Sequence, residues 1–344
     1  MRRRVLKLVS YVQTDGIRTV IKMVYERLEK WGAAILYCIR EFGFVYFIKR
    51  TYFFYTRQYG KYNKLNYSIL VNESGHIIHD FQKLTKSFPD DKRKKRVWVC
   101  WWQGYDKMPE IVKMCYDHMV YTLDGKLFDV KLITEENFKE YVDIPLPVVE
   151  KLQQGKITLT LFSDILRQGL LFQNGGIWID STIWVEKDAN KYLSFDKDFW
   201  SVKLEEIDDK NVWGQLITEC KWCGFLIGAK KDNVICGFTF RAMCDYVTKH
   251  NFVVDYFMQN LFIKIAYDMI PKVSEEIDEI ECSNPNLYEL FRYLNSAYSE
   301  NLYKSIMKDT AIFKLTYKSS LYEYSPEGAI TTYGYLRQRV SNEG

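Results

Sequence analysis

The chain has 344 residues, of which 47% are hydrophobic, 16% aromatic and 27% charged. This composition can bury a large core, and it excludes a disordered, collagen-like or Pro/Gly-rich linker protein. The net charge is only +4, but residues 1–64 hold 14 Lys and Arg against 4 Asp and Glu, whereas the remaining 280 residues hold 34 against 40. A basic, aromatic N-terminal segment therefore precedes a mildly acidic body.

Residues 1–64 are predicted to form two or three helices in which basic and apolar side chains alternate. The most apolar window, residues 31–48, has Arg40 and Glu41 at its centre. A membrane span needs about 20 apolar residues, and a charge at mid-bilayer costs about 3 kcal/mol. The pattern therefore favours a segment lying on an anionic membrane surface. A helical hairpin packed on the body is the alternative, and no nucleic-acid-binding motif accompanies the charge.

The first apolar run is interrupted by Lys7 and precedes no small-residue cleavage site, so no secretory signal is predicted. Eight cysteines, several of them inside apolar runs, suit a reducing cytoplasm with mostly buried thiols. Cys220 and Cys223 form a single CxxC pair, and the four histidines are scattered. Because zinc needs four ligands, ordinary packing is the preferred interpretation of this pair.

Beyond the N-terminal segment, residues 65–96 are polar, and the basic run at residues 92–96 is expected to be a solvated lead-in to the first strand. The sequence then alternates between short apolar runs and helical periodicity. Strands are expected at residues 97–102, 129–133, 177–180, 199–204 and 224–229, and helices at residues 109–120, 135–142 and 156–173. Such alternation predicts an α/β fold with a mainly parallel central sheet flanked by helices.

Three charged side chains stand out in the middle of the chain. Asp164 and Arg167 are three residues apart on a predicted helix and so share one face. Asp180 ends a buried strand, at the edge where α/β sheets bind ligands. An ordinary ion pair and a turn-initiating aspartate are the simpler alternatives.

The motifs around these residues occur in a specific order. They are Trp101-Trp102-Gln103-Gly104, Ser163-Asp164-Ile165-Leu166-Arg167 and Gly175-Gly176-Ile177-Trp178-Ile179-Asp180. This order resembles the nucleotide-sugar site of GT-A glycosyltransferases of the glycosyltransferase-32 type. More closely, it resembles the bacterial capsular polysaccharide synthesis proteins of that superfamily, over residues 95–320. The resemblance implies a Rossmann-like GT-A domain at residues 65–344, with donor motifs in 97–182 and the acceptor side in about 200–320.

The resemblance also implies roles for individual residues. Trp101, with Trp102 as the second choice, would stack on the uracil of a UDP-sugar. Asp164 would accept hydrogen bonds from ribose or sugar hydroxyls, and Arg167 would hold the donor. The family's glycine-containing motifs place three glycines in the donor site as well, namely Gly104, Gly175 and Gly176.

Asp180 matches the first acid of the Asp-x-Asp motif, which bridges the donor diphosphate to a divalent cation, Mn²⁺ or Mg²⁺. The second acid of that motif is Thr182 in this chain. A hydroxyl in place of a carboxylate weakens metal binding, so Asp180, Thr182, diphosphate oxygens and water would complete the site. Alternatively, Lys314 and Lys318 share the charge neutralisation, or are simply solvated lysines.

The resemblance implies hexose transfer with retention of configuration to a lipid-linked or growing oligosaccharide. Asp255 is a second catalytic candidate that would orient sugar hydroxyls, or else it caps a helix. Trp213 and Trp222 would form an acceptor wall, or else belong to the core. A polyprenyl-diphosphate acceptor would place the enzyme on the inner face of the bacterial membrane, attached peripherally through residues 1–64. Their deletion is expected to release the protein into the soluble fraction.

Two other functions are compatible with parts of the sequence. A catalytically inactive scaffold of a polysaccharide assembly complex would explain the missing second acid. A surface or nucleic-acid binder that acts through the N-terminal segment would make residues 65–344 dispensable. The combination of Asp164, Arg167 and Asp180 favours the glycosyltransferase over both.

Overall fold

The computed structural model describes residues 22, 25, 26, 28, 29, 31–82, 95–123, 127–206 and 212–343, without the side chains of residues 212 and 213. The chain divides into two compact units. The first comprises residues 1–66 together with 249–254, and the second comprises residues 67–248 together with 255–344. The functional division predicted from the sequence, at residues 64 and 65, stays a prediction.

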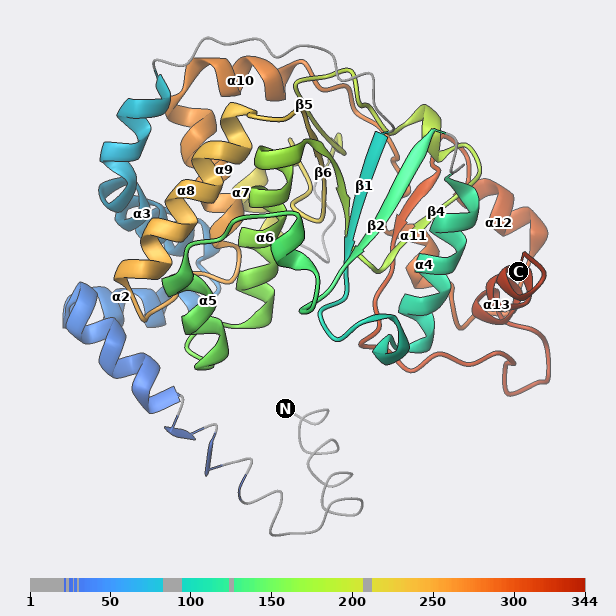
Figure 1. Cartoon of the computed structure of the whole chain (residues 1–344). Coiled ribbons are helices and arrows are strands. Elements are labelled where there is room, and N and C mark those ends of the chain that lie inside the picture. The colour runs from blue at the N-terminus through green and yellow to red at the C-terminus, as the bar shows by residue number, and fades with distance from the viewer. Residues whose placement is uncertain are drawn as a thin grey trace. The chain divides into compact units, whose positions relative to one another are not determined.

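Helices make up most of the described part of the first unit (Figure 1). Residues 31–42 are helical, α2 spans Phe44–Tyr55, and α3, which spans Tyr59–Gln82, begins in this unit. These helices agree with the helical prediction for the described residues, but much of the basic stretch lies outside them. No helix in the described ranges is both long and apolar enough to cross a membrane.

Polar contacts join residues 249–254 to these helices. Arg50 of α2 donates a hydrogen bond to the carbonyl oxygen of Val254 at 3.0 Å. The carboxylate of Glu41 accepts the amide of Asn251 at 3.0 Å. The acid at the centre of the most apolar window therefore has a partner within the unit, as expected for a helix that packs on protein.

The second unit is built on a five-stranded sheet with the order β2-β1-β3-β6-β5. The strands are β1 Lys95–Cys100, β2 Phe128–Ile133, β3 Gly176–Ile179, β5 Phe199–Ser201 and β6 Leu226–Ala229. Because β1 pairs in parallel with β2 and β3, and β6 is antiparallel to both of its neighbours, four strands point one way and only β6 is reversed. The mixed α/β architecture with a mostly parallel sheet is confirmed.

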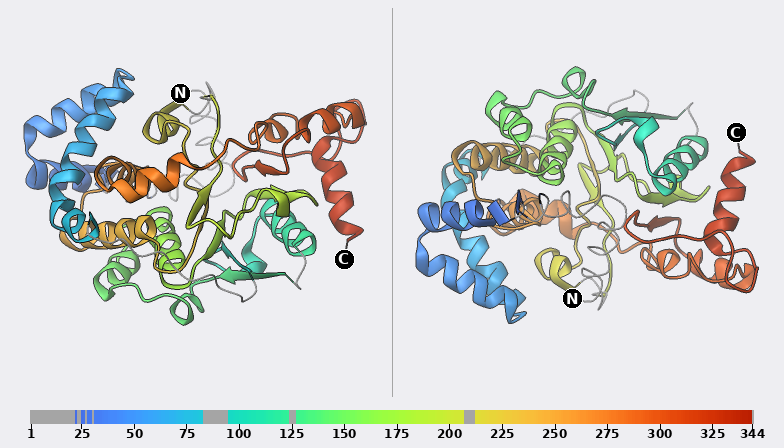
Figure 2. Two further views of the ribbon diagram at one scale, coloured as in Figure 1. Left: turned by 90° about the horizontal axis from the view of Figure 1, so that it is seen from above. Right: turned by 90° about the horizontal axis from the view of Figure 1, so that it is seen from below.

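Ten helices of at least four residues follow α3 in the described part of the second unit. They are α4 Glu110–Thr122, α5 Leu146–Gln153, α6 Leu159–Asn174, α7 Val212–Thr218, α8 Val234–Lys249, α9 Met258–Met269, α10 Pro271–Asp278, α11 Glu289–Arg292, α12 Glu300–Ile306 and α13 Thr332–Ser341. α6 packs across β1, β3 and β6, and α9 packs against α6 (Figure 2). The Thr158 hydroxyl caps α6 by accepting the amide of Leu161.

Some predicted elements need correction. No helix was expected in the polar stretch 65–96, but α3 continues into it as far as Gln82. Of the basic run at 92–96, Lys95 and Arg96 already belong to β1, and the rest lies outside the described residues. The helix expected at 135–142 is reduced to a three-residue 3₁₀ turn, Phe138–Glu140. In this segment the side chain of Asn137 accepts the amide of Thr134, a local bond that competes with helical pairing.

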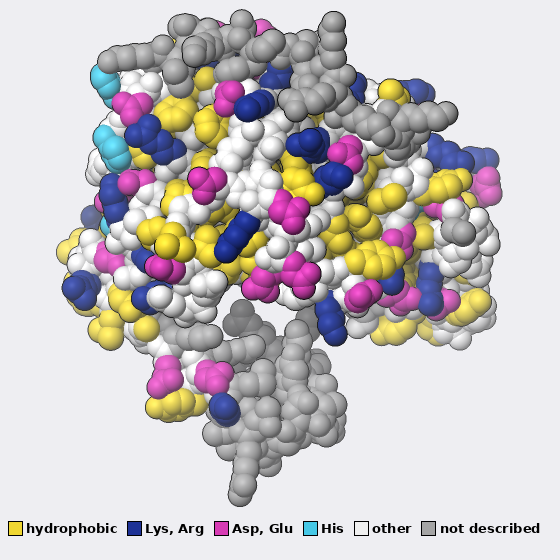
Figure 3. All heavy atoms as spheres, viewed as in Figure 1, with side chains coloured by type: hydrophobic (Ala, Val, Ile, Leu, Met, Phe, Trp, Pro, Cys, Tyr) yellow, Lys and Arg dark blue, Asp and Glu magenta, His cyan; other side chains and the backbone are white. Residues whose placement is uncertain are grey.

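Exposed apolar side chains are unevenly distributed over the described residues. Ten of the 19 exposed large hydrophobic residues lie between residues 25 and 55. They are Tyr25, Leu28, Trp31, Leu36, Phe44, Val45, Ile48, Tyr52, Phe54 and Tyr55. On the face of the molecule in Figure 3, apolar side chains lie among basic and acidic ones. This segment therefore holds more than half of the exposed large hydrophobic side chains of the described residues.

Candidate active site

A cavity of about 1300 Å³ lies where β1 and β3 end. Parallel strands bring their carboxyl ends to one edge of a sheet, which is where α/β folds bind ligands. Most of the sequence-predicted residues line this cavity: Trp101, Trp102, Asp164, Arg167, Asp180, Thr182, Trp222, Lys314 and Lys318. The residues proposed from separated motifs are therefore brought together.

Arg167 is the centre of the polar network in the cavity. Its side chain is only 6% exposed. Its Nη1 donates to Asp164 Oδ1 at 2.9 Å and to Gln259 Oε1 at 2.7 Å, and its Nη2 donates to Asp180 Oδ1 at 3.1 Å. The guanidinium also lies over the indole of Trp178, 4.9 Å from its centroid. One buried cation thus ties α6, α9 and the end of β3 together.

Both oxygens of Asp180 are engaged. Oδ1 accepts from Arg167 and from the Trp178 indole N–H at 2.9 Å, and Oδ2 accepts from Lys314 Nζ at 2.8 Å. Lys314 Nζ also donates to Thr182 Oγ1 at 2.9 Å. The ammonium of Lys314 therefore lies between the two side chains that correspond to the acids of an Asp-x-Asp motif.

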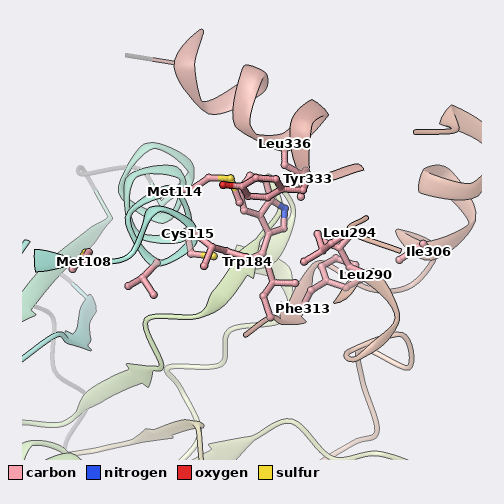
Figure 4. Packing of buried hydrophobic residues seen from close by; sticks show 13 residues of the cluster. Met108, Met114, Cys115, Trp184, Leu290, Leu294, Ile306, Phe313, Tyr333 and Leu336 are labelled. Carbon is pink, nitrogen blue, oxygen red and sulfur yellow. The ribbon is translucent and has the colours of Figure 1, made fainter. Parts of the chain in front are cut away.

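A small ribbon positions Lys314. β4 (Ile183–Val185) pairs antiparallel with β7 (Ile312–Lys314), and Ile183 is opposite Lys314. The buried side chains of Trp184 and Phe313 anchor this ribbon in a hydrophobic cluster with residues of α4, α11 and α13 (Figure 4). The cluster contains Met108, Ile111, Val112, Met114, Cys115, Trp184, Leu290, Leu294, Ile306, Phe313, Leu315, Tyr333 and Leu336. A lysine 134 residues from Asp180 in sequence is thus held rigidly beside it.

The two acids of the cavity have different electrostatic environments. Burial raises the pKa of Asp164 to about 6, although the nearby Arg167 opposes that rise. Burial would also raise the pKa of Asp180, but Lys314 and Arg167, with their hydrogen bonds, hold it below its usual value. Asp180 is therefore a firmly ionised carboxylate, whereas Asp164 lies close to titration near neutral pH.

As they stand, Asp180 and Thr182 do not offer a free ligand set for a divalent cation. Mg²⁺ and Mn²⁺ prefer several oxygen ligands, mainly carboxylates and water. Both oxygens of Asp180 and the hydroxyl of Thr182 already accept hydrogen bonds from cationic side chains. No group of three or more His, Cys, Asp or Glu that could hold a metal occurs in the described part of the chain.

The two adjacent tryptophans behave differently. Trp102 packs between Phe138 and Phe162, with ring centroids 5.2 and 5.1 Å away. Trp101 donates its indole N–H to the carbonyl of Lys107 and meets the exposed Tyr317 edge-on at 5.6 Å. Both indoles are partly buried and line the cavity, but Trp102 is held between two phenylalanine rings, so Trp101 is the better candidate for stacking on a ligand.

Several predicted site residues lie outside the cavity lining. Gly104, Gly175 and Gly176 are among them, and the last two lie at the start of β3, opposite the end that carries Asp180. Gly175 ends α6 with a φ of 70°, a value that favours glycine, so it serves the backbone. Gly175 and Gly176 therefore lie away from the cavity in which a donor is expected.

Asp255 and Trp222, which were predicted to contact the sugars, are both buried. Asp255 is 1% exposed, does not line the cavity, and accepts the amide of Phe257 at 2.6 Å; it lies before α9 but is not its N-cap, which is Phe257. Trp222 is 1% exposed and donates to Asn260, so it is a core residue without a face for a sugar. The side chain of Trp213 lies outside the described residues.

Sequence reasoning missed Gln259, Trp178 as a partner of Asp180, and the tyrosines of the cavity. Gln259 is 2% exposed and binds Arg167 only because α9 packs on α6, for which no local sequence signal exists. Tyr256 and Tyr317 are 57% and 47% exposed and line the cavity. Tyr256 directly follows Asp255, which the sequence predicted as a site residue.

The described side chains that line the cavity have a basic surplus. Five are basic, namely Lys107, Arg167, Arg292, Lys314 and Lys318, and two are acidic, namely Asp164 and Asp180. The unit that contains the cavity belongs to the acidic part of the chain, so this surplus is local. A cavity with this charge and with aromatic walls suits a ligand that is anionic and partly flat.

Comparison with known proteins is consistent with this geometry. A family model described as "Capsular polysaccharide synthesis protein" matches residues 49–334. The matched region includes every residue that lines the cavity. No curated protein sequence matches the chain.

Proposed function

The chain belongs to the capsular polysaccharide synthesis protein family, and we propose that it is a glycosyltransferase of the glycosyltransferase-32 type with a GT-A fold. Family membership suggests a role in capsule biosynthesis. The proposed reaction transfers a hexose from a UDP-sugar to a lipid-linked or growing oligosaccharide. The observation that carries this proposal is the buried Asp164–Arg167–Asp180 network inside a basic cavity at the end of β1 and β3.

The cavity offers a binding group for each part of a UDP-sugar. Trp101 is partly exposed and can stack on the uracil. Asp164 can accept hydrogen bonds from ribose or sugar hydroxyls. Lys314 and Lys318, the latter exposed at the rim, would bind the diphosphate. A volume of about 1300 Å³ leaves room for an acceptor beside the donor.

The proposed chemistry is transfer with retention, without a protein nucleophile. The bond between the sugar's anomeric carbon and the phosphate oxygen breaks, and the acceptor oxygen attacks from the same face. The leaving diphosphate takes the proton of the acceptor hydroxyl, so charge and atoms balance. The protein then contributes positioning and the stabilisation of negative charge on the diphosphate.

We propose Tyr256 and Tyr317 as aromatic contacts for the sugars, in place of the buried Trp222. Both are exposed and line the cavity, and sugars pack their C–H faces on aromatic rings. The acceptor in this proposal is anchored to a polyprenyl diphosphate at the inner face of the membrane. The exposed apolar residues between 25 and 55, together with nearby basic side chains, would attach the enzyme there.

Calorimetry with UDP and a screen of UDP-, GDP- and CDP-sugars test the donor assignment. Trp101→Ala is expected to weaken UDP binding about tenfold, because loss of base stacking costs about 1–3 kcal/mol. Tyr121→Ala is the matched control, since it removes an exposed aromatic side chain outside the cavity and should leave the affinity unchanged. Absence of binding by every nucleotide, and of sugar transfer, would support the inactive scaffold instead.

A further inference from the structure

We propose that Lys314 takes the place of the divalent cation, so that this site binds the donor diphosphate without a metal. This inference rests on the proposed function. It concerns how the negative charge of the donor and of the leaving group is balanced. The Asp-x-Asp resemblance predicted a metal at Asp180 and Thr182, and the side chains of this chain are arranged differently.

The position between Asp180 and Thr182 already holds a cation. Lys314 Nζ lies 2.8 Å from Asp180 Oδ2 and 2.9 Å from Thr182 Oγ1. A metal bound to either oxygen at a normal ligand distance of about 2.1–2.4 Å would lie beside this ammonium and repel it. Metal binding would therefore require Lys314 to leave.

Lys314 is poorly able to leave. Its backbone belongs to β7, opposite Ile183 of β4, and the next residue, Leu315, donates its amide to the carbonyl of Thr182 at 2.9 Å. The ammonium also lies 4.8 Å from the centroid of the Phe225 ring. These contacts fix the backbone of Lys314 beside Thr182, and the lysine side chain is only 22% exposed.

The substitution of Thr182 for a second acid fits the same arrangement. An ammonium carries one positive charge, and Asp180 already supplies one negative charge. If residue 182 were a second carboxylate, Lys314 and the two acids together would carry a net negative charge, which would repel a diphosphate. A hydroxyl can accept the Lys314 hydrogen bond without adding charge.

The lysine can still serve a ligand. An ammonium has three N–H donors, and Asp180 and Thr182 account for two of them. The third can donate to a phosphate oxygen in the cavity, which Lys314 lines. The lining side chains, five basic and two acidic, carry a net charge of +3, which is more than enough to balance the two negative charges of a UDP-sugar without a metal.

Calorimetric titration of the full-length protein with UDP, in EDTA and in Mn²⁺, tests the inference. We expect the same Kd in both conditions for the wild type. Lys314→Met is expected to weaken UDP binding in EDTA by about tenfold or more, since a charge-assisted hydrogen bond is lost. Lys308→Met, an exposed lysine that does not line the cavity, is the matched control and should bind as the wild type.

A second measurement uses the wild-type protein alone. Electron paramagnetic resonance of free Mn²⁺ in the presence of UDP, titrated with wild-type protein, should show no Mn²⁺ binding beyond that of UDP alone. Binding of UDP that requires Mn²⁺, or one equivalent of Mn²⁺ bound by the protein in excess of the UDP reference, would overturn the inference and leave the glycosyltransferase proposal intact. Failure of UDP to bind in either condition would overturn both.

Discussion

Of the two acids in the cavity, Asp164 is the one whose buried negative charge is less well stabilised by neighbouring cations and hydrogen bonds. Burial raises its pKa to about 6 from a reference value of 3.8, despite the ion pair with Arg167. The folded protein therefore holds this proton more tightly than the unfolded chain does. Stability conferred by the proton is lost as the pH rises from about 4 to about 6, and the full cost above that range is about 3 kcal/mol.

Because the ionised form of Asp164 destabilises the fold, Asp164→Asn, which keeps an oxygen for Arg167 and removes the buried charge, should gain stability relative to the wild type at high pH. The gain is the free energy of unfolding of the variant minus that of the wild type. It should be about half as large at pH 5 as at pH 8, because Asp164 of the wild type is partly protonated at pH 5. Urea unfolding at the two pH values measures it.

Asp188→Asn is the control for that experiment, because Asp188 is a surface carboxylate with 69% of its side chain exposed. Its effect on the free energy of unfolding should be the same at both pH values. If the effect of Asp164→Asn on the free energy of unfolding is likewise the same at both pH values, ionisation of the buried Asp164 carboxyl does not destabilise the folded protein.

Among the structural elements, β3 depends most directly on a single glycine. Gly176 has a φ of 106°, and a Cβ there would lie 2.5 Å from the carbonyl oxygen of Arg96 on β1. Gly176→Ala should lower the free energy of unfolding by at least about 2 kcal/mol, because both the backbone conformation and the close strand approach are disfavoured. Thermal or urea unfolding provides the measurement.

Gly75→Ala is the matched substitution for Gly176→Ala. Gly75 lies on the exposed side of α3, and a Cβ there would meet no atom within 4 Å. Alanine should therefore stabilise the helix by about 0.5–1 kcal/mol. Equal effects of the two substitutions would show that β3 tolerates a side chain at Gly176.

The elements also show what the sequence could predict. Asp164 and Arg167 were paired correctly because a helical repeat of three residues is a local property. Asp180 was predicted at the ligand-binding edge of the sheet, and it shares the cavity with Trp101 because β1 and β3 are neighbouring parallel strands that end at this edge. The contact of Lys314 with Asp180 depends on the β4–β7 ribbon and on a cluster formed by four distant segments, which no local pattern encodes.

Across the whole molecule, charge and exposed apolar area are concentrated near the start of the chain. Residues 1–64 carry a net charge of +10, and the described residues between 25 and 55 include ten exposed large hydrophobic side chains. Neither feature alone identifies a partner. Together they match an anionic membrane surface, which attracts basic residues by about 1 kcal/mol each and takes up apolar side chains.

This assignment predicts that the full-length protein binds anionic lipid vesicles through those apolar residues. Replacing Trp31, Phe44, Ile48 and Tyr52 together by Ser should weaken co-sedimentation with phosphatidylglycerol vesicles about tenfold or more. The control replaces four residues of similar exposure elsewhere, Val120, Tyr121, Leu127 and Leu146, and should bind as the wild type. Binding should also weaken as salt is added, since basic side chains contribute. If both quadruple variants sediment like the wild type, residues 25–55 do not attach the protein to membranes.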